Sequence, residues 1–129
     1  MLQRTLAMAG SIRMFRLIFW LATLFAVTMA VLPKPPHLPI DRFGDKFQHM
    51  LAFAVIALLA ALSWPAASRW RIAVRLSLLG AMIEVVQAIP SLHRDSDVRD
   101  WVADTVALGL VLLLVALYER IRAVPGAKR

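Results

Sequence analysis

The chain has 129 residues, of which 60% are hydrophobic, and a formal net charge of +7 at pH 7. This composition is too apolar for an ordinary soluble domain, in which about 45–50% of residues are apolar, so it predicts a single membrane domain over residues 1–129. The lack of cysteine excludes disulfides and thiolate-bound metals, and the basic residues do not indicate nucleic-acid binding, because they cluster at the ends of apolar segments as the flanks of membrane spans do.

Four apolar segments follow one another along the chain, and each is close to the roughly 20 residues that a helix needs to cross a bilayer. The first three are directly followed by Pro33, Pro65 and Pro90, which cannot continue a helix without cost. Because lipid leaves backbone polar groups unsatisfied unless the segment is helical or part of a closed barrel, the pattern predicts an all-α, polytopic bundle. Its four transmembrane helices are expected at residues 14–32, 47–64, 72–89 and 101–118.

The first segment has a second interpretation. Its arginine-rich start, apolar stretch and small residues around Thr28-Met29-Ala30 also resemble a cleaved signal peptide. The apolar run is long for the hydrophobic region of a signal peptide, which has about 7–15 residues. A retained helix is therefore favoured, and cleavage would leave three spans.

The distribution of Lys and Arg predicts the orientation. With four spans, both termini and the second loop share one side of the membrane, and that side carries ten basic residues against five on the other. The positive-inside rule then places both termini in the cytoplasm and the first and third loops outside. The ten are Arg4, Arg13, Arg16, Arg69, Arg71, Arg75, Arg120, Arg122, Lys128 and Arg129, and the five are Lys34, Arg42, Lys46, Arg94 and Arg99.

Polar side chains gather at the predicted outer ends of the last three helices. A charge near the centre of a membrane helix costs about 2.5–3.5 kcal/mol on insertion scales, so such residues usually face a bundle interior and mark a functional site. The sequence therefore predicts an outward-facing polar pocket within the bundle. The residues expected to line it are Asp45, His49, Glu84, Gln87, Arg94, Asp100 and Asp104.

The spacing of these residues supports shared faces, and each pair also has a structural interpretation. Asp45 and His49 are four residues apart on the second helix, where Asp45 is equally suited to cap the helix. Glu84 and Gln87 are three apart on the third helix, and Glu84 lies about 9 Å inward of Pro90. A hydrogen bond that joins two helices, or an ion pair with Arg94 or His49, is the alternative for Glu84.

The third loop and the start of the fourth helix complete the set. Arg94 lies in a loop of mixed charge and is the side chain best suited to bidentate capture of a phosphate or carboxylate. Asp100 and Asp104 are four residues apart; Asp100 is placed to cap the helix, whereas Asp104 lies one turn deeper. A solvated surface loop is the alternative for Arg94.

Five elements of this pattern follow one another in order. They are Asp45-Lys46-x-x-His49, Glu84-x-x-Gln87, Arg94, Asp100 and Ala103-Asp104-Thr105. This order resembles the VanZ-like family of small bacterial membrane proteins, over about residues 45–114, and the resemblance adds Lys46 to the candidate positions. It implies a multi-pass protein of the bacterial inner membrane, linked to low-level resistance to teicoplanin-type glycopeptides. The chain departs from the family pattern at Ala107, where many members have glycine.

The first functional hypothesis is a binding protein. Its outward-facing pocket would hold an amphiphile or anionic ligand of the cell envelope, such as a lipid-linked wall precursor or the tail of a lipoglycopeptide. Arg94 would bind the anionic group, and His49, Glu84 and Gln87 would orient polar atoms of the ligand. The expected partners are this ligand and the lipid bilayer, with no nucleic acid, no cofactor and no metal.

Two other functions remain open at this point. In an enzyme acting at the membrane surface, His49 oriented by Asp45 would be a base and Glu84 an acid. A metal-dependent variant of that enzyme would use His49, Glu84 and Asp100 as ligands. In a scaffold or partner subunit, the same polar side chains would only lock the helices together.

Overall fold

The computed structural model of the protein describes the backbone of residues 2–123 and the side chains of residues 8–123. Within that part of the chain every regular element is helical, which confirms the expected all-α fold. The elements are α1 (Leu2–Val31), η1 (Pro39–Phe43), α2 (Asp45–Ser63), α3 (Arg69–Gln87), η2 (Pro90–Leu92) and α4 (Val98–Ala123), where η marks a short 3₁₀ helix. Among the basic residues used to predict the orientation, Lys128, Arg129 and the side chain of Arg4 lie outside the described residues.

Three of the four long helices are long and apolar enough to cross a membrane. They are Met8–Val31 within α1, Asp45–Ser63 and Val98–Ala123. The helix α3 has 19 residues, but three arginines and one glutamate make it more polar than the other three. The protein is thus a helical bundle with the hallmarks of a membrane protein, in which α3 differs from its neighbours.

The ends of the helices follow local chemistry more closely than the limits of the apolar segments. The helix α1 starts well before the predicted span and α4 continues past it, because a helix can extend beyond the hydrocarbon. The start of α2 is set by Gly44, whose φ of +87° lies in the region that side chains rarely adopt. Asp45 therefore becomes the first residue of α2, two residues before the predicted start.

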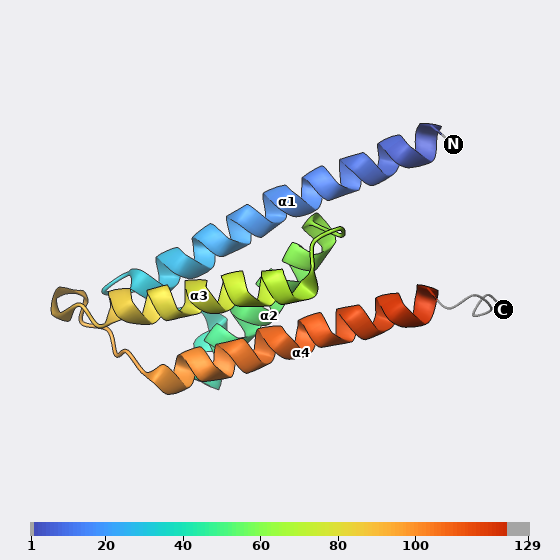
Figure 1. The fold of residues 1–129 in the computed structure, drawn as a ribbon. Coiled ribbons are helices and arrows are strands. Elements are labelled where there is room, and N and C mark those ends of the chain that lie inside the picture. Colours follow the sequence, from blue (N-terminus) through green and yellow to red (C-terminus); the bar gives the residue numbers. More distant parts are fainter. Residues whose placement is uncertain (1, 124–129) are drawn as a thin grey trace.

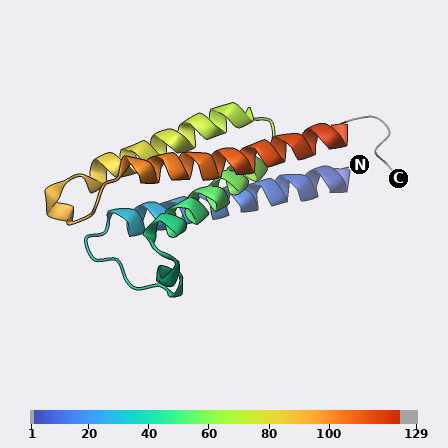
Figure 2. The same ribbon diagram turned by 90° about the horizontal axis from the view of Figure 1, so that it is seen from below.

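The centre of the bundle is α2, which packs along α4 and α1, while α3 packs mainly on α4. Figures 1 and 2 show that α1 and α4 both run past the turn between α2 and α3, at the end of the bundle where α1 begins and α4 ends. The helices α1 and α4 have 30 and 26 residues, against 19 in each of the other two. At 1.5 Å per residue they are longer by about 10–17 Å.

Small residues let the helices approach closely. Ala57 and Ala60 of α2 are buried in the core, as is typical of membrane bundles, in which packing rather than a hydrophobic force joins the helices. At Gly80 of α3, a Cβ atom would lie 3.3 Å from Cδ1 of Trp101 and 3.4 Å from Cζ of Phe53. The glycine thus permits the contact of α3 with both α2 and α4.

Two arginines fasten the turn between α2 and α3 to the longer helices. Arg16 of α1 donates from Nε to the carbonyl oxygen of Ser63 at 3.1 Å. Arg69 forms a salt bridge with Glu119 of α4 and donates to the carbonyl oxygen of Pro65 at 3.1 Å. The carbonyls that the end of α2 leaves without helical partners are in this way partly satisfied by side chains.

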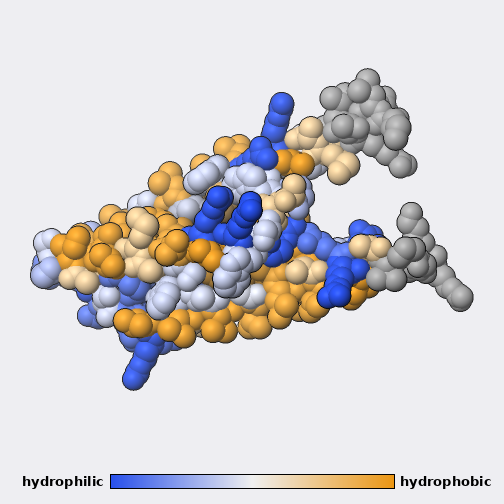
Figure 3. All heavy atoms as spheres, viewed as in Figure 1, coloured by the Kyte–Doolittle hydropathy of each residue, from blue (hydrophilic) through white to orange (hydrophobic). Residues whose placement is uncertain are grey.

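The outer surface of the bundle is largely apolar. Large hydrophobic side chains such as Leu24, Leu110 and Leu114 are more than half exposed, and Figure 3 shows hydrophobic atoms along α1 and α4. A hydrophilic area interrupts this surface over the first turns of α3. Such extensive apolar exposure fits a protein surrounded by lipid, since soluble monomers rarely expose large apolar patches.

The close approach at Gly80 predicts a position-specific loss of stability. The substitution Gly80→Leu should lower the free energy of unfolding by about 1–3 kcal/mol, because overpacking forces side chains and backbone to shift. Gly109→Leu on α4 is the matched control, since nothing lies within 4 Å of a Cβ built there. Unfolding of both variants in the same detergent measures the difference, and an equal loss in the two would contradict the packing of α3 described here.

Candidate functional site

His49 is the centre of a cluster of charged side chains at the end of the bundle where α2 and α4 both begin. Its Nδ1 lies 3.7 Å from Oδ2 of Asp104, and its Nε2 lies 3.8 Å from Oδ1 of Asp45. The side chain of His49 is 12% exposed and that of Asp104 is 3% exposed, whereas Asp45 is largely open. The imidazole therefore lies between a buried carboxylate on α4 and an exposed one on its own helix.

Two cations complete this cluster. Nζ of Lys46 lies 3.0 Å from Oδ1 of Asp100, which joins α2 to α4 a second time. A guanidinium nitrogen of Arg94, in the third loop, lies 4.0 Å from Oδ2 of Asp45. This separation is at the outer limit of an ion pair, so Arg94 keeps most of its hydrogen-bonding capacity for another group.

The local sequence explains why these groups meet. Asp45 and His49 are one turn apart on α2, and Asp100 and Asp104 are one turn apart on α4, so each pair shares a face. Gly44 occupies the capping position of α2, and no side-chain hydrogen bond caps that end. The carboxylate of Asp45 is therefore not used as a helix cap and faces His49 and Arg94.

The structure places Glu84 and Gln87 away from this cluster. Oε2 of Glu84 accepts hydrogen bonds from Oγ of Ser96 at 3.1 Å and from the backbone N–H of Asp97 at 2.9 Å. Nε2 of Gln87 donates to the carbonyl oxygen of Ala30, at the end of α1, at 3.0 Å. Glu84 thus orders the third loop. The hydrogen bond between two helices that the sequence suggested for Glu84 is made instead by Gln87, which joins α3 to α1.

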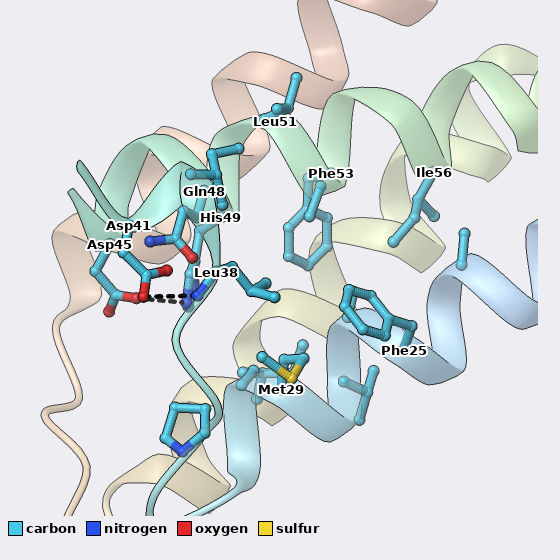
Figure 4. A pocket seen from close by; sticks show the side chains of 18 of the residues that line it. Phe25, Met29, Leu38, Asp41, Asp45, Gln48, His49, Leu51, Phe53 and Ile56 are labelled. Carbon is cyan, nitrogen blue, oxygen red and sulfur yellow. Dashed lines mark hydrogen bonds and ion pairs between the residues drawn. The ribbon is translucent and has the colours of Figure 1, made fainter. Parts of the chain in front are cut away.

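A cavity of about 710 Å³ opens beside the charged cluster. Residues from the second half of α1, the first loop and the first half of α2 line most of it, with Leu79, Ile83 and Arg94 on the remaining side. Figure 4 shows Asp45, Gln48 and His49 at one end and Phe25, Phe53 and Ile56 at the other. The cavity therefore has apolar walls and a charged mouth.

Several residues of this site carry no distinctive signal in the sequence. The walls include Phe25, Met29 and Phe53, which read like any other apolar residue of a membrane helix. Ser96, which bonds Glu84, reads as an ordinary loop serine. Lys34 is an exception: it is an exposed cation at the edge of an apolar segment and lines the cavity, so a search for basic residues near Arg94 could have included it.

The arrangement suits binding of an amphiphile or proton transfer by His49 more readily than coordination of a metal. In the described part of the chain, no group of three or more His, Cys, Asp or Glu side chains is placed to hold a metal ion. Oδ1 of Asp104 is buried without a hydrogen-bond partner among the described residues. An unpaired buried carboxylate oxygen is costly, so His49 is the group on which the burial of Asp104 depends.

Comparison of the chain with models of protein families, with curated proteins and with solved structures finds no match.

The contacts of Glu84 predict a structural effect of its removal. Glu84→Ala should lower the free energy of unfolding by about 1–3 kcal/mol, because it leaves the N–H of Asp97 without its acceptor. The hydroxyl of Ser96 loses only one of two acceptors, since it also donates to the backbone carbonyl of residue 84. Hydrogen exchange at the amide of Asp97 should become faster in the same variant. Val85→Ala, at the exposed neighbouring position, is the control, and normal exchange at Asp97 in Glu84→Ala would show that the carboxylate does not order the loop.

Proposed function

We propose that the protein is a VanZ-like binding protein of the bacterial cytoplasmic membrane, whose cavity holds an envelope amphiphile with an anionic head group. The observation that carries this proposal is the cavity of about 710 Å³, in which apolar walls lead to a mouth with charged residues. Ligand sites commonly combine mostly apolar walls with a few placed polar groups. The resemblance in the ordered motif residues supports the same proposal from the sequence.

The proposed topology has four spans with both termini in the cytoplasm. The helix α3 packs against α4 and runs back along the bundle from the turn after α2, which supports a span by α3 beside its more apolar neighbours. The buried bond from Gln87 to the carbonyl of Ala30 makes α1 part of the bundle, which supports a retained first helix. The excess of basic residues at the end where α1 begins then directs the cavity mouth outward.

The walls of the cavity suit an alkyl or prenyl chain. Phe25, Leu51 and Val55 line the cavity and are also among the exposed hydrophobic residues of the bundle. A ligand chain in the cavity would therefore remain in contact with the surrounding lipid. This arrangement lets an amphiphile enter sideways from the membrane without first passing through water.

The mouth suits an anionic head group. Arg94 has one distant ion-pair partner, and Lys34, which also lines the cavity, forms no ion pair with any described residue. Arginine and lysine hold phosphate and carboxylate groups through charge-assisted hydrogen bonds. Asp45 and His49 lie beside these cations and are placed to accept hydrogen bonds from hydroxyl groups of the ligand.

The binding proposal predicts a specific loss of affinity. Arg94→Gln should raise the Kd for a fluorescent single-chain alkyl phosphate by about 10–100-fold, as expected for the loss of a hydrogen bond to a charged group worth about 1.5–3 kcal/mol. Arg99→Gln removes the same charge five residues further on, in the first turn of α4 and outside the cavity, and should bind the probe normally. Fluorescence titration in detergent measures both, and equal affinities of the two variants would contradict the proposed head-group site.

The source of the ligand is tested with the same variants in cells. If the ligand is a lipoglycopeptide, cells producing the wild-type chain should tolerate teicoplanin better than cells producing Arg94→Gln at equal expression. If the ligand is a lipid-linked wall precursor, that precursor should copurify with the wild-type protein and not with Arg94→Gln. If the wild type and Arg94→Gln differ neither in teicoplanin tolerance nor in copurified precursor, both sources are excluded.

A second function, acid–base catalysis on the bound amphiphile, is supported by the position of His49. Its Nδ1 faces the buried carboxylate of Asp104, and its ring lines the cavity. A carboxylate behind one ring nitrogen orients the imidazole and stabilises its protonated form. His49 would then take a proton from a water molecule or from a hydroxyl group of the ligand, whereas the sequence had assigned the orienting role to Asp45.

Catalysis and binding alone predict different effects of two conservative substitutions. If the protein is an enzyme, His49→Gln and Asp104→Asn should each lower turnover of a lipid-linked phosphate ester by about 10²–10⁴-fold, the usual contribution of a general acid or base. Binding of the alkyl phosphate probe should change little in His49→Gln. Mass spectrometry of the lipid products after incubation with purified protein measures turnover, and unchanged lipid with the wild-type protein leaves binding as the function.

A further inference from the structure

Two arginines of α3 have no role in the site described above. Arg71 and Arg75 lie one turn apart near the start of α3, and both are exposed. Neither side chain forms an ion pair or hydrogen bond with another described residue. Arg69, in contrast, forms a salt bridge with Glu119. Of the three arginines of α3, only Arg69 therefore has an anionic partner among the described residues.

The same face of α3 continues as an apolar stripe. Leu78, Met82 and Val85 are each more than half exposed. Their positions, three to four residues apart and continuing the spacing of Arg71 and Arg75, place all five on one side of the helix. Figure 3 shows the corresponding hydrophilic area over the first turns of α3, with hydrophobic atoms around it.

The dimensions of this face match one leaflet of a bilayer. At 1.5 Å per residue, Arg75 and Val85 are separated by about 15 Å along α3, and half of a hydrocarbon core of about 30 Å is the same length. Trp70, beside Arg71, is exposed, and exposed tryptophan is enriched at the level of lipid head groups. Trp70 therefore supports placing the start of α3, with Arg71, at the level of the lipid head groups. From there the face runs from charged residues to apolar ones.

We propose that Arg71 and Arg75 bind the head group of an anionic phospholipid of the cytoplasmic leaflet, with an acyl chain along Leu78, Met82 and Val85. This site lies on α3, apart from the cavity between α1 and α2, and takes its ligand from the opposite leaflet. The inference rests on the proposed placement of α3 in the membrane and not on the ligand of the cavity.

A phospholipid fits this face better than another anionic partner for two reasons. A water-soluble anion would be bound by the two arginines alone and would leave the apolar stripe unused. Exposed arginines close to the hydrocarbon need an anionic partner at that depth, and clusters of basic residues at the cytoplasmic surface attract anionic lipids. The lipid phosphate supplies the charge, and its chain covers the stripe.

The test is retention of phosphatidylglycerol by the purified full-length protein in neutral detergent, read by native mass spectrometry. Each basic residue near an anionic surface contributes about five-fold in affinity, so R71Q/R75Q should bind phosphatidylglycerol about 25-fold more weakly. The zwitterionic phosphatidylcholine should bind weakly to both proteins. R71K/R75K keeps the charges and should retain the preference for phosphatidylglycerol, which separates loss of binding from misfolding.

The control is R120Q/R122Q, which removes two exposed arginines from α4 at the same end of the bundle. It should bind phosphatidylglycerol like the wild type. Equal losses in the two double variants, equal binding of the two lipids by the wild type, or normal binding by R71Q/R75Q would each overturn the proposed site.

Two further measurements separate this proposal from the functions proposed above. Arg94→Gln should keep the phosphatidylglycerol bound to α3, since the two sites share no residue. Ala66→Cys, in the exposed turn before α3, should react with a membrane-impermeant thiol reagent only from the cytoplasmic side. Labelling of that cysteine from outside would reject the membrane orientation itself, whereas cytoplasmic labelling with no lipid preference would reject the lipid site alone.

Discussion

The pairing of His49 with Asp104 is the contact on which the polar end of this bundle depends. Lipid offers no partner to a buried carboxylate, and the cost of an isolated charge in such surroundings is high. Asp104 lies in the contact between α2 and α4, the most extensive in the bundle, so its burial is possible because α2 brings an imidazole to it. The same requirement places Lys46 against Asp100 and holds the starts of the two helices together.

The fold could be predicted from the sequence because the hydrocarbon of a bilayer constrains the backbone. No such constraint decides which polar side chains meet, so the site could be predicted only in part. Apolar segments of membrane-spanning length predicted the helices, because lipid permits few other structures. Glu84 was grouped with His49 and Arg94 because all three lie near the same end of the chain's helices. Its actual partners are Ser96 and Asp97, since the rotation of α3 is set by packing such as that at Gly80, which is not encoded in the spacing of polar residues.

The cavity was beyond sequence reasoning for a related reason. In a soluble protein, apolar residues that line a cavity stand out because their neighbours face water. In this chain Phe25 and Met29 are surrounded by other apolar residues that face lipid, so no contrast marks them. The sequence located the charged mouth, through Asp45, His49 and Arg94, and only the fold revealed which apolar surface adjoins it.

The attachment of α1 has a consequence for the volume of the cavity. One wall of the cavity is α1, and two described hydrogen bonds fasten this helix to the others: Arg16 to Ser63 at one end and Gln87 to Ala30 at the other. Between these two fixed points, the side chains of α1 that face the cavity are held by packing alone. A bend of α1 between these two points would leave both hydrogen bonds intact. It would widen the space beside α1 for a bulkier ligand chain without moving the charged residues at the mouth.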